Sequence, residues 1–320
     1  MPPHPFPVQY RISVDDADLW ARLATEVGPV LQRIGLVCEA AVLRPVVNTV
    51  ADDTLKLVFR DPRARPGAVL LCSRPAAPDL VARGVEKSVA AKQLLGNPLG
   101  RVILEPIASG NVDGLSYVLL PWRCSLSHVR YTWAIQRVML LPHLLRWLRD
   151  VTQKTARTPD GNGACFVAAL GHIASNLHMQ AALRRLADCA IGRIQAGEWK
   201  PQHVLAHNDL WSGNLLLDSP TNWLMCVATG QFIVIDWAGA LVSGYPLFDL
   251  LRLAQSLRVP GKALAREVQS HMRILGGTSD EARWYVLAAL GNLGLNLEHF
   301  PEHHYLQLVD QCWQTITTVT

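Results

Sequence analysis

The sequence has little that would indicate a secreted, zinc-binding or disulfide-stabilised protein. It contains seven cysteines, and no two of them form a Cys-x-x-Cys pair or a zinc-ligand spacing. An odd number of thiols, most of them within apolar stretches, is typical of reduced cysteines. The chain also opens without the basic, apolar and small-residue pattern of a signal peptide. We therefore expect free thiols and a cytoplasmic location.

Long apolar runs and concentrated charge are also missing. One of the longest apolar stretches, residues 284–297, is interrupted by Gly and Asn, and it is shorter than the roughly 18 to 20 residues that a membrane helix needs. Lys and Arg are scattered, and the net charge of +4 is small for 320 residues. A nucleic-acid-binding protein would show a concentrated basic face. The composition therefore predicts neither a membrane span nor a nucleic-acid partner, and it leaves the oligomeric state open.

The sequence does contain enough apolar residues for a large core. Half of the chain, 50%, is hydrophobic and 18% is charged, over 320 residues. This is sufficient for one large domain or for two lobes.

The N-terminal part, residues 1–122, predicts a helix followed by a small sheet. Leu19, Leu23 and Val27 form an apolar stripe at helical spacing. Five strand-like segments and one further helix come next. The strands are expected at residues 41–47, 54–60, 68–74, 101–108 and 116–122, and the helix at 79–95, between the third and fourth strands.

From residue 123 to 320 the pattern is mainly helical. A helix over residues 129–150 carries an apolar stripe that includes Leu144 and Leu148, and Pro142 is expected to interrupt it. Thr278 and Glu281 have the spacing of a helix capping box. Further helices are expected within residues 164–195 and at 246–257, 261–275, 279–297 and 301–316.

One stretch within this helical part has a different character. Residues 204–218 read as a strand, a short polar loop and a second strand, with His207, Asp209 and Asn214 in the loop. Downstream, another buried strand ends at Asp236. Phosphoryl transfer needs a carboxylate to accept a hydroxyl proton and oxygen ligands for magnesium on the nucleotide phosphates. These residue types, in this order, match that chemistry.

The set of motifs resembles the aminoglycoside phosphotransferase and choline kinase superfamily. The resemblance rests on His207-x-Asp209-x4-Asn214, on Ile235-Asp236-Trp237, and on the segment from Gly244 to Leu250. It extends from about Ala41 to Leu257. It implies an α+β, protein-kinase-like bilobal fold with a small β-sheet N-terminal lobe, residues 1–122, and a mainly helical C-terminal lobe, residues 123–320.

The resemblance also implies roles for the loop residues. Asp209 is expected to position and deprotonate the acceptor hydroxyl, and His207 to brace the loop by hydrogen bonds without acting as a base. Asn214 and Asp236 are expected to hold Mg²⁺ on the phosphates of ATP. Asp249 is expected to support the catalytic loop or to cap the following helix, outside the reaction itself.

The N-terminal lobe departs from the pattern of such kinases. They place a lysine on the third strand and pair it with a glutamate on the next helix. Glu86 lies at the expected glutamate position, but the third strand has no lysine. Arg74 is our first candidate for the cation and Lys56, on the preceding strand, is the second. Glu86 could equally be an ordinary solvated residue of a helix face.

Two further elements of the nucleotide site are predicted from their order in the chain. The loop that should cover the phosphates, Asn48 to Asp53, contains no glycine. We therefore infer no nest of backbone amides there, and Asn48 and Thr49 are the candidate hydrogen-bond donors to the phosphates. The strand leading to the hinge between lobes would present backbone groups of Leu120 and Trp122 to adenine. Alternatively, Trp122 is simply a core residue.

We therefore predict an ATP- and Mg²⁺-dependent small-molecule kinase that moves the γ-phosphoryl group to a hydroxyl. The acceptor would be a sugar, an amino alcohol or an antibiotic-like compound. Acidic residues are not concentrated in the C-terminal lobe, which disfavours a polycationic acceptor. The alternative is a pseudokinase that binds a nucleotide or a partner without phosphoryl transfer, and its evidence is the glycine-free loop and the missing lysine. A structural protein that binds no nucleotide is the third reading.

Overall fold

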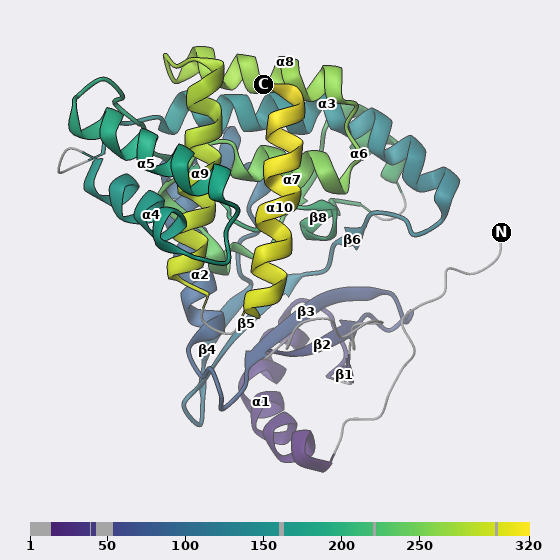
Figure 1. Cartoon of the computed structure of the whole chain (residues 1–320). Helices are drawn as coiled ribbons and strands as arrows, with labels where there is room; N and C mark the ends of the chain where they lie inside the picture. The colour runs from purple at the N-terminus through teal and green to yellow at the C-terminus, as the bar shows by residue number, and fades with distance from the viewer. Residues whose placement is uncertain (1–13, 39, 43–53, 160–162, 220–221, 298–299) are drawn as a thin grey trace. The chain divides into compact units, whose positions relative to one another are not determined.

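The computed structural model describes residues 14–38, 40–42, 54–159, 163–219, 222–297 and 300–320 (Figure 1). The chain forms two compact units. One comprises Met1–Ser88 and Ile103–Cys124, and the other comprises Val89–Val102 and Ser125–Thr320. The first contains an antiparallel sheet and the second is mainly helical. The fold class predicted from the sequence, α+β and protein-kinase-like with a sheet region and a helical region, is confirmed.

The first unit is built on a five-stranded antiparallel sheet in the order β1-β2-β3-β5-β4. Helix α1 precedes it in the chain, and its predicted stripe of Leu19, Leu23 and Val27 is buried against the sheet together with Leu57 and Leu70. Strand residues alternate between this face and the opposite one, so a single helix covers one face. The bounds are α1 Val14–Arg33, β1 Ala40–Val42, β2 Thr54–Arg60, β3 Pro66–Ser73, β4 Ala108–Val112 and β5 Leu115–Pro121.

Two buried serines tie helix α2 (Leu80–Leu95) to this sheet. The hydroxyls of Ser73 on β3 and Ser116 on β5 lie 2.8 Å apart. The first accepts a hydrogen bond from the N–H of Val81, and the second accepts one from the N–H of Ala82. Helix-terminal N–H groups have no partner within the helix, so the sheet satisfies two of them and sets where α2 begins.

The fourth strand was predicted wrongly at residues 101–108. Leu99–Val102 form a short 3-10 helix, η1, and the strand β4 begins only at Ala108. The hairpin turn decides the pairing: Asp113 and Gly114 have φ of 52° and 80°, and Val112 faces Leu115. Two residues with positive φ form the turn type that best fits the strand twist.

The second unit contains most of the helices. They are α3 Arg130–Thr155, α4 Ala164–Ser175, α5 Ala181–Gln195, α6 Trp223–Thr229, α7 Phe248–Ser256, α8 Gly261–Ile274, α9 Ser279–Leu295 and α10 Glu302–Val319. The strands are β7 Val204–Ala206, β8 Leu215–Leu217, β9 Phe232–Val234 and β10 Leu241–Gly244, and β6 (Cys124–Ser125) spans the boundary between the units in sequence. The predicted capping box of α9 is present: the Thr278 hydroxyl accepts from the N–H of Glu281, and the Glu281 carboxylate accepts from the N–H of Thr278.

Helix α3 continues through Pro142, contrary to the predicted interruption. Pro142 is exposed, so the carbonyl that loses its partner there is on the solvent side, where water can satisfy it. The predicted stripe residues Leu144 and Leu148 are buried, as is Leu140 two residues before the proline. Burial on both sides of Pro142 keeps the helix in one piece. Within the parts of the chain that the structure describes, no helix is both long and apolar enough to cross a membrane.

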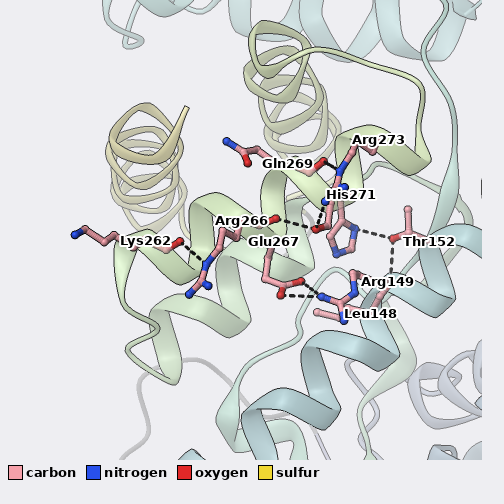
Figure 2. Close-up of polar contacts among 10 residues, drawn as sticks. Leu148, Arg149, Thr152, Lys262, Arg266, Glu267, Gln269, His271 and Arg273 are labelled. Carbon is pink, nitrogen blue, oxygen red and sulfur yellow. Dashed lines mark hydrogen bonds and ion pairs between the residues drawn. The ribbon is translucent and has the colours of Figure 1, made fainter.

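Helices α3 and α8 are joined by two polar contacts (Figure 2). The guanidinium of Arg149 on α3 donates to both carboxylate oxygens of Glu267 on α8 at 2.8 Å. One turn further along each helix, the Thr152 hydroxyl lies 2.9 Å from Nδ1 of His271. His271 is only 2% exposed. This ion pair and the buried imidazole hold the two helices in one register.

This buried histidine predicts a pH dependence of stability. Burial, reinforced by the positive charge of Arg149, lowers the pKa of His271 to about 4. In the unfolded chain an imidazole takes up a proton near pH 6.5, so between about pH 6.5 and 4 the unfolded state binds more protons. The free energy of unfolding should therefore fall with decreasing pH in this window, by roughly 2–3 kcal/mol. Urea titrations from pH 7.5 to 4.5 on wild type and His271→Met should show the steeper decline in wild type, and parallel curves would contradict the assignment.

Candidate active site

A short loop between two strands brings the predicted site residues together. β7 ends directly before His207, and β8 begins directly after Asn214. β8 pairs antiparallel with β9, with Leu215 opposite Val234. The N–H of Ile235 donates to the carbonyl of Asn214 at 3.0 Å. The hairpin thus places Asp236, which follows β9, beside the end of the loop. The connection between β8 and β9 contains the short helix α6.

Asp209 and Asn214 are joined directly. Nδ2 of Asn214 donates to the backbone carbonyl of Asp209 at 2.8 Å and to its Oδ2 at 3.0 Å. Asn214 is 7% exposed, whereas 47% of the Asp209 side chain is exposed. Asn214 therefore holds one side of the Asp209 carboxylate, and the rest of that carboxylate is open to solvent. Because the amide nitrogen of Asn214 is engaged, its Oδ1 is left for an incoming donor or cation.

The surroundings of Asp209 make its carboxylate a better proton acceptor than an ordinary aspartate. Burial raises its pKa to about 6, and the negative charge of Asp236 acts in the same direction. The Arg252 guanidinium and the hydrogen bonds from Asn214 and Trp211 oppose the rise. A carboxylate with a pKa near 6 is largely ionised at pH 7, yet it is more basic than an ordinary aspartate. It is suited to take a proton from a hydroxyl.

Asp236 is exposed and has an unusual backbone conformation. Its φ is 65° and its ψ is 60°, in the left-handed region. Aspartate is one of the few residues other than glycine that tolerates this region, and such conformations are concentrated at functional sites. Asn208, with φ 66°, and Leu247, with φ 72°, share the feature. Three such residues around one loop indicate that its shape is held by the surrounding contacts.

His207 links the loop to the strand before Asp236. The residue is 2% exposed, and its Nε2 lies 2.9 Å from the carbonyl of Ile235. Because a carbonyl only accepts, Nε2 carries the proton, and Nδ1 accepts the N–H of Asp209 at 3.3 Å. Burial lowers the pKa of His207. Both ring nitrogens are thus occupied by backbone groups, and the ring is a neutral connector.

Asp249 holds the start of the loop from helix α7. Its Oδ2 accepts from the N–H of His207 at 2.6 Å, and its Oδ1 accepts from the N–H of Asn208 at 2.9 Å. Only 9% of the residue is exposed. Burial raises the pKa of the Asp249 carboxyl, and the two amide donors counteract the rise. One carboxylate therefore fixes two consecutive peptide groups just before Asp209.

Arg252 belongs to the site, although the sequence reading missed it. Its guanidinium lies 4.0 Å from Oδ1 of Asp209. It lies on α7, one helical turn after Asp249, so the two side chains share a helix face. The spacing of Asp249 and Arg252 was the signal that could have identified it.

The donor set around Asp209 fits a magnesium ion. Mg²⁺ prefers oxygen ligands, and kinase sites typically use one or two protein groups together with substrate phosphates. Oδ1 of Asn214 and the exposed carboxylate of Asp236 are oxygen groups of this kind. The negative charge of Asp236 is close enough to raise the pKa of Asp209. Within the described residues, no cluster of three or more His, Cys, Asp or Glu side chains forms a site built from protein ligands alone.

The predicted nucleotide residues of the first unit lie on or next to its sheet and on α2. Leu120 is on β5, and Trp122 directly follows it, with its N–H donating to the carbonyl of Gly67 at 3.0 Å. Arg74 directly follows β3, Lys56 lies on β2 opposite Leu71, and the exposed Glu86 is on α2. The pairing of Arg74 with Glu86 and the hinge role of Leu120 and Trp122 stay predictions.

Two other predicted nucleotide residues, Asn48 and Thr49, lie outside the described residues.

This chain is similar to known phosphotransferases in part of its sequence and in its fold. Residues 135–285, which contain the whole loop and Asp249, match the family model described as phosphotransferase enzyme family. No curated protein sequence matches the chain. Two solved structures share its fold at a TM-score of 0.52 each.

One of these structures is a thermostable mutant of aminoglycoside phosphotransferase APH(4)-Ia in its apo form, with 14% identity over 90% of this chain and 97% of that chain. The other is a putative fructosamine-3-kinase from Haemophilus somnus 129PT, with 10% identity over 94% of this chain and 97% of that chain. At these identities the structures establish the fold. The family match, on a chain with this fold, confirms the predicted resemblance to the aminoglycoside phosphotransferase and choline kinase superfamily and the prediction of a small-molecule kinase.

Proposed function

We propose that the protein transfers the γ-phosphoryl group of ATP to a hydroxyl group of a small molecule, with Mg²⁺ as the metal. The observation that carries this proposal is the arrangement at the loop. An accessible carboxylate, Asp209, is hydrogen-bonded to Asn214, and both adjoin Asp236. A proton acceptor and two oxygen ligands at one place are what phosphoryl transfer requires of a protein.

In this proposal, Asp209 accepts the proton of the acceptor hydroxyl. The hydroxyl oxygen forms a bond to the γ-phosphorus, and the bond from phosphorus to the bridging oxygen breaks to release ADP. Asn214 keeps the carboxylate oriented through its bond to Oδ2. Mg²⁺, held by Asn214 and Asp236, would neutralise charge on the phosphates. General-base assistance of this kind contributes roughly 10²–10⁴-fold.

Strand alternation in the first unit supports Lys56 as the phosphate-binding cation. Leu55 and Leu57 beside it are buried in the core under α1, so Lys56 projects to the opposite face of the sheet. On β3 that face carries Val69, Leu71 and Ser73, none of them cationic. By the same alternation, Arg74 falls on the side of Ala68, Leu70 and Cys72, which face the core. If the nucleotide binds this face, Lys56 replaces the missing third-strand lysine from the neighbouring strand, where it lies opposite Leu71.

The acceptor we propose is a sugar, an amino alcohol or another metabolite of modest charge. A polycationic aminoglycoside would need a concentration of carboxylates, and the acidic residues of this chain are dispersed. An antibiotic-like acceptor of lower charge would fit the same chemistry.

An assay for phosphoryl transfer tests the proposal. The protein is incubated with ATP labelled at the γ-phosphate, with and without Mg²⁺, and with panels of sugars, amino alcohols and aminoglycosides. We expect Mg²⁺-dependent label in at least one hydroxyl compound. Tight Mg-ATP binding without transfer to any compound or to water would instead indicate a protein that keeps the fold for binding alone.

A further inference from the structure

Nε2 of His271 is a buried polar atom that needs a partner. It makes no hydrogen bond to any protein atom that the structure describes, and His271 is 2% exposed. Leaving a buried hydrogen-bonding atom unsatisfied is costly, so each such atom calls for an explanation. The His271 side chain projects from α8 toward Thr152 on α3 (Figure 2).

The tautomer of His271 follows from its other contact. The hydroxyl of Thr152 donates its single proton to the carbonyl of Leu148 at 3.0 Å. The same oxygen lies 2.9 Å from Nδ1 of His271 and therefore accepts the Nδ1 proton. Nε2 of the neutral ring is then an acceptor with a free lone pair. It requires a hydrogen-bond donor, which the neighbouring apolar side chains cannot provide.

A small cavity adjoins this ring. It has a volume of about 20 Å³, and His271, Thr152, Tyr245 and Asp249 line it together with leucines and valines of α3, β7 and α7. A cavity needs about 10–15 Å³, measured in this way, to accommodate one water molecule, and the water needs two or more polar partners. The cavity therefore has room for one water.

The second partner is chosen, among the polar side chains that line the cavity, by its strength as an acceptor. The Tyr245 hydroxyl donates to the carbonyl of Cys165. The Thr152 hydroxyl is engaged by Leu148 and His271. Each carboxylate oxygen of Asp249 accepts one backbone N–H, and each has a second lone pair. Asp249 is therefore the strongest remaining acceptor for a water proton.

We propose that this cavity binds one water molecule, which donates one proton to His271 Nε2 and the other to the carboxylate of Asp249. The bridge connects α8 to the carboxylate that fixes His207 and Asn208, so His271 is a positioning residue for the catalytic loop. The water site depends only on the contacts above, whereas the positioning role rests on the proposed function.

The electrostatic surroundings agree with a neutral acceptor. The charged groups that face His271 are Arg149 of α3, which is paired with Glu267 of α8, and Asp249 across the cavity. The positive charge of Arg149 and burial keep the pKa of His271 well below 6.5, so the ring stays unprotonated at neutral pH.

The first test is a high-resolution crystal structure of the wild-type protein. It should show one water within hydrogen-bond distance of both His271 Nε2 and an Asp249 carboxylate oxygen. A dry cavity, or a water without contact to Asp249, would overturn the proposal. This measurement needs neither a variant nor a substrate, so it separates failure of the water site from failure of the proposed kinase activity.

The second test uses a matched pair of variants and amide hydrogen exchange. His271→Met and His271→Gln have side chains of the same length, and only Gln can accept from the water. In His271→Met, the backbone amides of His207 and Asn208 should exchange roughly tenfold faster, as expected for loss of one hydrogen bond. His271→Gln should restore most of the protection.

A control comes from His172 on α4, whose Nε2 is also buried without a protein partner among the described residues. His172→Met should leave exchange at His207 and Asn208 unchanged. Once an acceptor is known, His271→Met should lower kcat and leave KM for ATP unchanged. Equal exchange in wild type and His271→Met would refute the positioning role.

Discussion

Replacing Asp209 with Asn should lower the rate of phosphoryl transfer by about 10²–10⁴-fold while leaving nucleotide affinity unchanged. An amide of the same shape cannot accept the hydroxyl proton. The hydrogen bond from Asn214 to the backbone carbonyl of residue 209, at 2.8 Å, does not involve the replaced group, so the loop should keep its conformation. The measurement is kcat and KM for ATP with the acceptor that the transfer assay identifies.

The control is Asp218→Asn, an exposed aspartate just beyond β8 in the same segment. It removes the same charge close in sequence, and its kcat should stay within about twofold of wild type. Turnover of Asp209→Asn near the wild-type rate would remove this residue from the chemistry.

Replacing Asp249 with Asn should lower the free energy of unfolding by about 2–4 kcal/mol. The carboxylate accepts two backbone N–H groups with separate oxygens. An amide has one acceptor oxygen, and its NH₂ group would face the second backbone donor. One buried N–H is then unsatisfied and another donor opposes it. The result should appear as a lower urea midpoint with an unchanged m-value.

The loss should extend to activity, because the two N–H groups belong to His207 and Asn208, directly before Asp209. Asp188→Asn on α5 is the matched surface control, since Asp188 is exposed, and it should change stability by less than about 0.5 kcal/mol. If Asp249→Asn were as stable as this control, the two hydrogen bonds would not support the loop.

That the candidate site residues lie together was predictable, because they are close in sequence and lie at strand ends. The apolar runs before His207 and after Asn214 predicted the strands, and the strand before Asp236 was equally plain. Pairing of β8 with β9 then brings Asn214 and Asp236 together. A local pattern was enough, because a single hairpin assembles most of the site.

Contacts between distant segments could not be read from the sequence. Nothing in the pattern around Asp249 showed that its two oxygens meet the amides of His207 and Asn208. His271 was an unremarked helix residue, and its pairing with Thr152 depends on how α3 packs on α8. The misplaced fourth strand has a similar cause, because the turn at Asp113 and Gly114 decides the register and the apolar content of residues 101–108 does not.

The central claim, a magnesium-dependent nucleotide site at the loop, is tested most directly by calorimetric titration of ATP into wild type and Asp236→Asn, each with and without Mg²⁺. Asparagine tolerates the left-handed backbone of residue 236 as well as aspartate does, so the substitution changes the charge and keeps the loop conformation. We expect wild type to bind ATP more tightly with Mg²⁺ and the variant to lose that gain. No binding of ATP to wild type under either condition, or an equal gain from Mg²⁺ in the variant, would contradict the account.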